Sequence, residues 1–167
     1  MKPEGILNSE LGIMNRKADG KDTKKDGLKL AVAVVNTGIG LEKWQEMNTV
    51  AHLNAAFGAR KGMNSGMFYQ DQIITNDKVS LPLNIQHAIM IKQADASAKL
   101  LDLVGKAKEA GLDVSVFTRE MLITTNDKKV VEMTAEKSAA DLEMLGVLVY
   151  GDKAQVEELT KEFGLFS

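Results

Sequence analysis

The side chains best suited to hydrogen bonding with a ligand lie together on one predicted helix. Asn48 and His52 are four residues apart, so a helix places them on one face, with Trp44 one turn earlier. An amide and an imidazole can both donate and accept hydrogen bonds. We therefore predict Asn48 and His52 as ligand-binding residues. The alternative is that they satisfy buried backbone groups, which is what buried polar side chains usually do.

A second candidate pair, Thr118 and Arg119, follows the predicted strand Val114–Phe117 at its carboxyl end. Ligands of open α/β sheets gather at these ends. An arginine there can pair with a phosphate or carboxylate, and a threonine can donate a hydrogen bond. Thr118 and Arg119 complete the predicted site, which would hold a small polar or anionic ligand. The structural alternatives are a salt bridge of Arg119 and a helix cap by Thr118.

Other motifs give weaker evidence for a binding or catalytic role. The turn Gly38-Ile39-Gly40 has the position of a phosphate-binding loop, but it holds two glycines and has Lys43 where a third would stand. This pattern favours a tight turn over a phosphate site. His52 has no histidine or carboxylate at metal-ligand spacing, and the chain contains no cysteine. We predict no metal and no cofactor.

The elements that would position these residues begin with a buried strand, Leu28–Val35, and a long helix, Leu41–Phe57. A nearly continuous apolar strand that leads into a helix is typical of a sheet covered on both faces. The helix is predicted to bury a wide face that includes Trp44 and Met47, with Leu53 and Phe57 beside them. Gly58 and Gly62 are predicted to end it, with Gly58 as a left-handed cap. The fold class is therefore α/β.

The rest of the chain supplies more strands and helices. Ile85–Ile91, a helix capped by Asp95 that runs to Ala110, and Val114–Phe117 form a predicted parallel crossover unit. The remaining predicted elements are a hairpin of Met67–Ile74 with Val79–Leu83, a helix from Thr124–Asp127 towards Met133, the strand Leu145–Tyr150, and a helix Ala154–Phe163 capped by Asp152. Pro82 marks the second hairpin strand as an edge strand or a non-strand.

Composition limits the domain organisation and the partners. A chain of 167 residues normally forms one domain with its own core. We predict a single α/β domain over residues 28–167, preceded by a polar arm, Met1–Gly27. The arm is either a solvated tail or a segment whose residues Ile6–Met14 pack on a partner copy.

Charge and hydropathy set further limits. A net charge of −2 gives no general attraction to nucleic acid or to anionic membranes. The longest apolar run, Ala31–Val35, is far shorter than the roughly 20 residues that span a bilayer. The N-terminus lacks the apolar core of a signal peptide. These observations favour a cytoplasmic protein.

Several segments resemble a family of uncharacterised bacterial proteins that is grouped with type II peptidyl-tRNA hydrolases. They are the strand Leu30–Val35, the helix from Trp44 to Phe57-Gly58 with Asn48 and His52, the segment Val116–Met121, and the ending Leu145-Gly146, Gly151 and Leu165. The resemblance extends from Leu28 onward. It implies a three-layer α/β/α sandwich around a small mixed sheet, paired as a homodimer.

This sequence lacks some of the residues that are characteristic of the hydrolases. The lysine that opens the hydrolases' first helix is missing from Met47–Ala51, and Lys43 lies about one turn too early. Arg119 matches their third-strand motif, but the aspartate and glycine before it are replaced by Val116-Phe117-Thr118. The sequence thus leaves open whether the chain is an enzyme. The alternatives to ligand binding are hydrolysis of peptidyl-tRNA or a related acyl ester, and a structural or interaction protein that acts as a dimer.

Overall fold

The structure is a computed structural model that describes residues 27–62, 67, 73–81 and 87–167. The predicted arm, apart from Gly27, lies outside the described residues. So do residues 68–72 of the first predicted hairpin strand and residues 82–86, which include Pro82. The described parts of this region, β2 (Ile73–Ile74) and β3 (Ser80–Leu81), pair antiparallel as a hairpin, as predicted.

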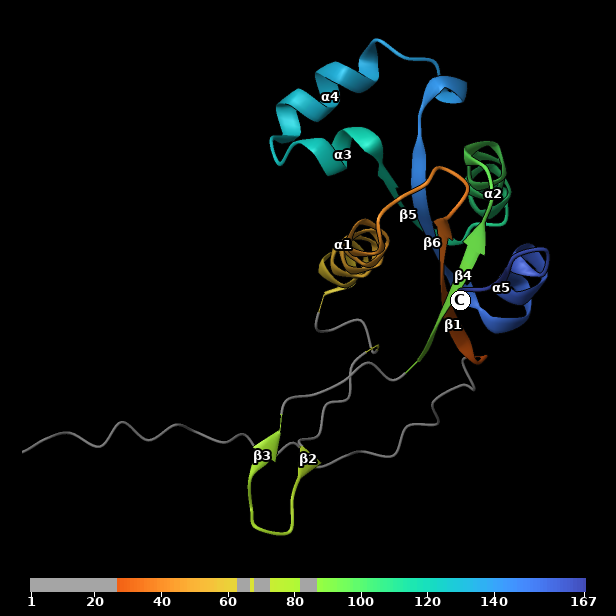
Figure 1. Cartoon of the computed structure of the whole chain (residues 1–167). Coiled ribbons are helices and arrows are strands. Elements are labelled where there is room, and N and C mark those ends of the chain that lie inside the picture. Colours follow the sequence, from red (N-terminus) through yellow and green to blue (C-terminus); the bar gives the residue numbers. More distant parts are fainter. Residues whose placement is uncertain (1–26, 63–66, 68–72, 82–86) are drawn as a thin grey trace, which may run out of the picture.

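The core is a mixed sheet of five strands in the order β5-β6-β1-β4-β7 (Figure 1). Its centre is β1 (Lys29–Asn36), in which every residue after Lys29 is buried. β1 runs parallel to β4 (Ala88–Ala94) and antiparallel to β6 (Met144–Asp152). The edges are β5 (Asp113–Thr118), antiparallel to β6, and the short β7 (Gly164–Leu165), antiparallel to β4. The predicted α/β class is confirmed, with a mixed sheet.

Alternate residues of β1 enter two separate hydrophobic clusters because successive side chains of a strand point to opposite faces. Leu30, Val32 and Val34 belong to a cluster that contains residues of α2 (Ser97–Glu109) and α5 (Lys153–Thr160). Ala31 and Ala33 belong to a cluster with residues of α1 (Lys43–Lys61). Helices therefore pack against both faces of the sheet, as the apolar first strand predicted.

The predicted face of α1 is correct for Leu53 and Phe57 and wrong for Trp44 and Met47. Its buried residues are Glu46, Thr49, Leu53 and Phe57, whereas Trp44 and Met47 are 58% and 66% exposed. Apolar residues occur on several sides of this helix, so its pattern does not select a face. The close contact with β6 decides which face of α1 is buried: a Cβ atom on Gly146 would lie 2.6 Å from Thr49 Cγ2.

Of the two glycines predicted to end α1, Gly58 lies inside the helix, so its assignment as the cap is wrong. The helix continues to Lys61, and the cap is Gly62, which has a φ of 69°. A positive φ favours glycine, so the second glycine rather than the first ends the helix.

The predicted crossover of β4, α2 and β5 is confirmed as a parallel connection, but it passes over β6 and β1, which lie between its two strands. The predicted cap of α2 is wrong, because the helix begins at Ser97 after Ala96, and Asp95 instead forms an ion pair with Lys99 at 2.8 Å. Gly111, with a φ of 68°, follows the end of the helix as predicted.

The C-terminal half holds one helix that the sequence did not predict, α3 (Arg119–Ile123). Next come α4 (Asp127–Ala135), capped by the Asn126 side chain, and a short 3-10 helix, η1 (Ala139–Asp141). Asp152 caps α5 as predicted and accepts a hydrogen bond from the Ala154 backbone N–H at 3.1 Å. In the described part of the chain, no helix has both the length and the apolar character needed to cross a membrane.

One buried side chain joins the ends of three elements. Asn36, the last residue of β1, is fully buried; its Nδ2 donates to the Met144 carbonyl at 2.9 Å and to Ser97 Oγ at 3.2 Å. Its Oδ1 accepts from the Gly38 backbone N–H at 3.1 Å. This draws the turn against the loop before α2, where a Cβ on Gly38 would lie 1.9 Å from the Asp95 carbonyl oxygen. The close packing of this turn against the loop before α2 therefore requires glycine at position 38.

We predict opposite effects from alanine at two glycines. Gly38→Ala should destabilise the fold by about 3 kcal/mol, since its Cβ overlaps backbone that cannot move independently. Gly58→Ala should stabilise it by about 0.5–1 kcal/mol, because Gly58 lies inside α1 with open space around its Cβ position. Urea denaturation of both variants measures the difference. Equal stabilities would contradict the close packing of the Gly38 turn.

Candidate functional site

A cleft of about 680 Å³ opens between α1, the edge strand β5 and the pair α3 and α4. Figure 1 shows α3 and α4 on the same side of the sheet as α1. The walls of the cleft are mostly apolar, and several polar groups also line it. The lining residues are Asn48, His52, Ala56, Val116, Phe117, Met121, Leu122, Thr124, Thr125, Asp127, Val130 and Val131.

The structure brings Asn48 and His52 together on the α1 wall of this cleft. The His52 ring stacks on Phe117, with 4.8 Å between ring centroids and 14° between planes. This contact orients the imidazole ring. Both side chains line the cleft, and the structure thus places them on one helix face, as the helical spacing predicted.

Thr118 and Arg119 lie elsewhere, at the junction of β5 and α3, and are not among the cleft-lining residues. The Arg119 guanidinium forms an ion pair with Glu143, with Nε donating to Oε1 at 2.7 Å. The Arg119 backbone N–H also donates to the Glu143 carbonyl at 3.0 Å. Thr118 is buried. The salt-bridge interpretation of Arg119 thus agrees with the structure.

The next residue, Glu120, is a carboxylate with 1% exposure that forms an ion pair with Lys137. Burial alone would raise the pKa of Glu120. Hydrogen bonding and charge attraction, chiefly from Lys137, outweigh burial, so the pKa lies below its ordinary value. The Thr118 hydroxyl and Oε2 of Glu120 make no hydrogen bond of regular geometry with the described residues, so Lys137 is the principal partner.

These ion pairs hold one wall of the cleft in place. No residue of α4 is buried, and its tertiary packing is against α3. The Arg119–Glu143 and Glu120–Lys137 pairs connect the start of α3 to the chain on the far side of α4. The α3–α4 wall is therefore attached by these ion pairs at its base and by Met121 and Leu122 of α3, which pack against the core cluster of α1.

The apolar part of the cleft was missed by the sequence analysis. Phe117, Met121, Leu122, Val130 and Val131 form it. The pair Met121-Leu122 and the pair Val130-Val131 are its signal in the sequence, but the first lies on a helix of five residues that periodicity does not reveal.

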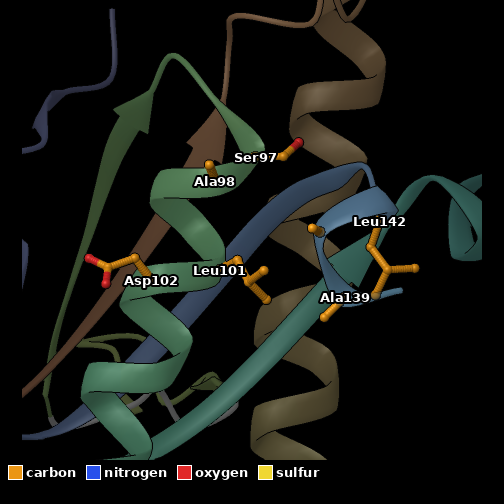
Figure 2. A pocket seen from close by; sticks show the side chains of 7 residues that line it. Ser97, Ala98, Leu101, Asp102, Ala139 and Leu142 are labelled. Atoms are coloured by element: carbon orange, nitrogen blue, oxygen red, sulfur yellow. The ribbon is translucent and has the colours of Figure 1, made fainter. Parts of the chain in front are cut away.

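A second, smaller cavity of about 330 Å³ lies between α2 and η1 (Figure 2). Its Ser97 hydroxyl oxygen already accepts hydrogen bonds from Asn36 and from the Met144 backbone N–H at 3.1 Å. Asp102 pairs with Lys106 at 2.6 Å, and Figure 2 shows it pointing in a different direction from Ser97. The two polar side chains do not form a catalytic pair, so this cavity is the weaker candidate.

Over residues 27–62, 67, 73–81 and 87–167, no three histidine, aspartate or glutamate side chains gather in a metal-binding arrangement. The only histidine in the larger cleft, among the residues described there, stacks on Phe117. The chemistry that this site offers is hydrogen bonding and apolar contact.

The fold and the cleft define an α/β protein with a mixed five-stranded sheet and a mainly apolar cleft beside its edge strand. Residues 29–167 match the family described as protein of unknown function DUF2000, and the chain belongs to that family. Membership in a family of uncharacterised proteins is thus confirmed. The matched region begins with β1 and leaves out the N-terminal arm.

A solved structure with a similar fold is that of Atu0240, a protein of unknown function from Agrobacterium tumefaciens strain C58. The superposition has a TM-score of 0.70 and covers 83% of this chain and 98% of that chain, with 16% sequence identity. At this identity, the likeness concerns the fold alone. No curated protein matches the chain.

We predict that Lys137→Met destabilises the protein by about 2 kcal/mol at pH 7. Breaking a buried ion pair costs about 3–5 kcal/mol, and the 40% exposure of Lys137 reduces this figure. In the native protein, the lowered pKa of Glu120 stabilises the fold above the unfolded pKa of about 4.3, and this contribution is lost as the pH falls through the folded-state pKa.

In the variant, burial controls Glu120 and raises its folded-state pKa above the unfolded value. The destabilisation should therefore be smaller at pH 5 than at pH 7, measured by urea unfolding at both values. The control is Lys128→Met, whose exposed partner Glu132 lies 3.9 Å away and whose loss should cost less than about 0.5 kcal/mol. A cost for Lys137→Met that does not change with pH would contradict the role of Glu120.

Proposed function

We propose that this protein binds a small ligand in the cleft between α1 and the α3–α4 wall. The observation that carries the proposal is the cleft itself, about 680 Å³ in volume, with mainly apolar walls and a few polar groups. Ligand sites in proteins commonly have volumes of about 300–1,000 Å³ and this kind of lining. The family has no assigned function, so the proposal rests on the geometry.

Asn48 and His52 would orient the ligand through hydrogen bonds, and the apolar residues of β5, α3 and α4 would contact its body. The predicted preference for an anion depended on Arg119, which pairs with Glu143. Among the described lining residues, Asp127 is the charged one. This favours a neutral ligand, or one with a positively charged group, over an anion.

We also propose the finer fold assignment that the resemblance implies, a three-layer α/β/α sandwich like that of type II peptidyl-tRNA hydrolases. Its support is the packing of helices against both faces of the mixed sheet. The proposal does not extend to ester hydrolysis. Lys43 pairs with Glu46 at 3.3 Å and Arg119 with Glu143, and neither is among the lining residues of the cleft.

The ligand proposal predicts that filling the cleft abolishes binding. A screen of neutral aromatic and amine-bearing fragments by ¹H–¹⁵N NMR should give hits that shift amide signals of residues lining the cleft. Ala56→Leu, which adds a larger side chain inside the cleft, should weaken these hits by at least about tenfold, or about 1.4 kcal/mol.

Ala55→Leu is the matched control, because Ala55 is an exposed neighbour on α1 that is not among the lining residues. Its affinities should stay within about twofold of the native values. Asn48→Ala should weaken hits that carry a hydrogen-bonding group more than purely apolar hits. Hits that bind Ala56→Leu and the native protein equally would overturn the proposal.

A further inference from the structure

We propose that the ligand of this cleft is an extended peptide segment that adds as a strand to the open edge of β5. This inference rests on the proposed function and names its ligand class. The segment would carry an apolar residue and, near it, a lysine or arginine.

β5 is the last strand of the sheet and pairs only with β6 among the described residues. An edge strand presents backbone N–H and C=O groups that no neighbouring strand satisfies. Such an edge can pair with an added peptide strand, and this is a recurring mode of peptide recognition. The open edge of β5 is therefore a possible template for a strand.

The first half of this edge is covered by the last turn of α1. Arg60 Nη2 donates to the Val114 carbonyl at 2.7 Å and also contacts the Ser115 hydroxyl. Lys61 forms an ion pair with Asp113. Charged groups thus protect the start of β5 from pairing with other chains, which is a common protection of edge strands.

The second half of the edge meets the cleft. Because Arg60 reaches the Val114 carbonyl from outside the ladder, we infer that Val114 directs its backbone groups away from β6. In an antiparallel pair this direction alternates, so Val116, two residues later, directs its N–H and C=O the same way. Val116 is also a lining residue of the cleft and is 38% exposed. Its backbone groups can thus pair with a bound peptide.

The rest of the cleft fits the side chains of such a peptide. Alternate side chains of an added strand point to one side, where Met121, Leu122 and Val130 provide an apolar wall. Asp127, at the start of α4, makes no ion pair with the described residues. A lysine or arginine in the peptide would complement this carboxylate. A simple apolar compound would leave both Asp127 and the Val116 backbone unused.

The test uses an acetylated and amidated hexapeptide in which valine and lysine stand two residues apart, with serine between them, so that both point to the same side of an added strand. It is titrated into the ¹⁵N-labelled full chain. Two methylated versions separate backbone pairing from side-chain contact. One is N-methylated at the valine and lysine positions and the other at the serines. In an added strand, only alternate residues bond to β5. One methylated peptide should therefore lose at least about tenfold in affinity and the other less than about twofold.

A second arm changes the protein. Val116→Pro removes the backbone N–H that faces the cleft, at an edge position where proline is tolerated, and should lower peptide affinity by at least about tenfold. Val114→Pro, its matched control, removes an N–H on the covered half of the edge, and should change the affinity by less than about twofold. The Ala56→Leu variant should also lose the peptide.

Each other outcome overturns the inference. Equal binding of the two methylated peptides would show contact through side chains only. If fragments bind the cleft and the peptide does not, the proposed function stands and the peptide inference is rejected. Failure of both would remove both proposals. If sedimentation experiments show a dimer, and Val116→Pro dissociates it, the open edge of β5 binds a second copy of the chain instead of a peptide.

Discussion

The structure depends most on the hydrogen bonds of Asn36. This fully buried amide ends the central strand and holds the Met144 carbonyl, Ser97 Oγ and the Gly38 N–H. These groups belong to the start of β6, the start of α2 and the turn before α1. Each buried polar group left unpaired costs about 1–3 kcal/mol, so the three contacts are satisfied together or lost together. One side chain therefore links the central strand to the turn before α1 and to the start of α2.

The cleft lies away from this centre and is built differently. Its outer wall, α4, has no buried residue and is reached through α3, whose first two residues are held by ion pairs with Glu143 and Lys137. Segments with little buried apolar area open at lower free energy than the core. A rigid sheet thus carries an adaptable wall, and this combination suits a site that must admit a ligand between them.

The sequence predicted what depends on local patterns and missed what depends on contacts between distant elements. The apolar period of β1 and the cap Asp152 are local, and both predictions agree with the structure. The buried face of α1 was predicted only in part, because its position depends on the contact of Thr49 with Gly146 on β6. For the site, Asn48 and His52 share a face by spacing alone. The ion pair of Arg119 involves a glutamate 24 residues away, which no local pattern reveals.

The position of β6 in the sheet has a consequence for how the chain matures on the ribosome. β6 is the last long strand in the sequence, yet it lies between β1, the first strand, and β5. Until residues 144–152 leave the exit tunnel, β1 and β5 have no strand between them and the Asn36 amide lacks its Met144 partner. Contacts between such distant segments form slowly. The nascent chain must therefore keep its apolar first strand from aggregating until β6 emerges, and the sheet closes only after that.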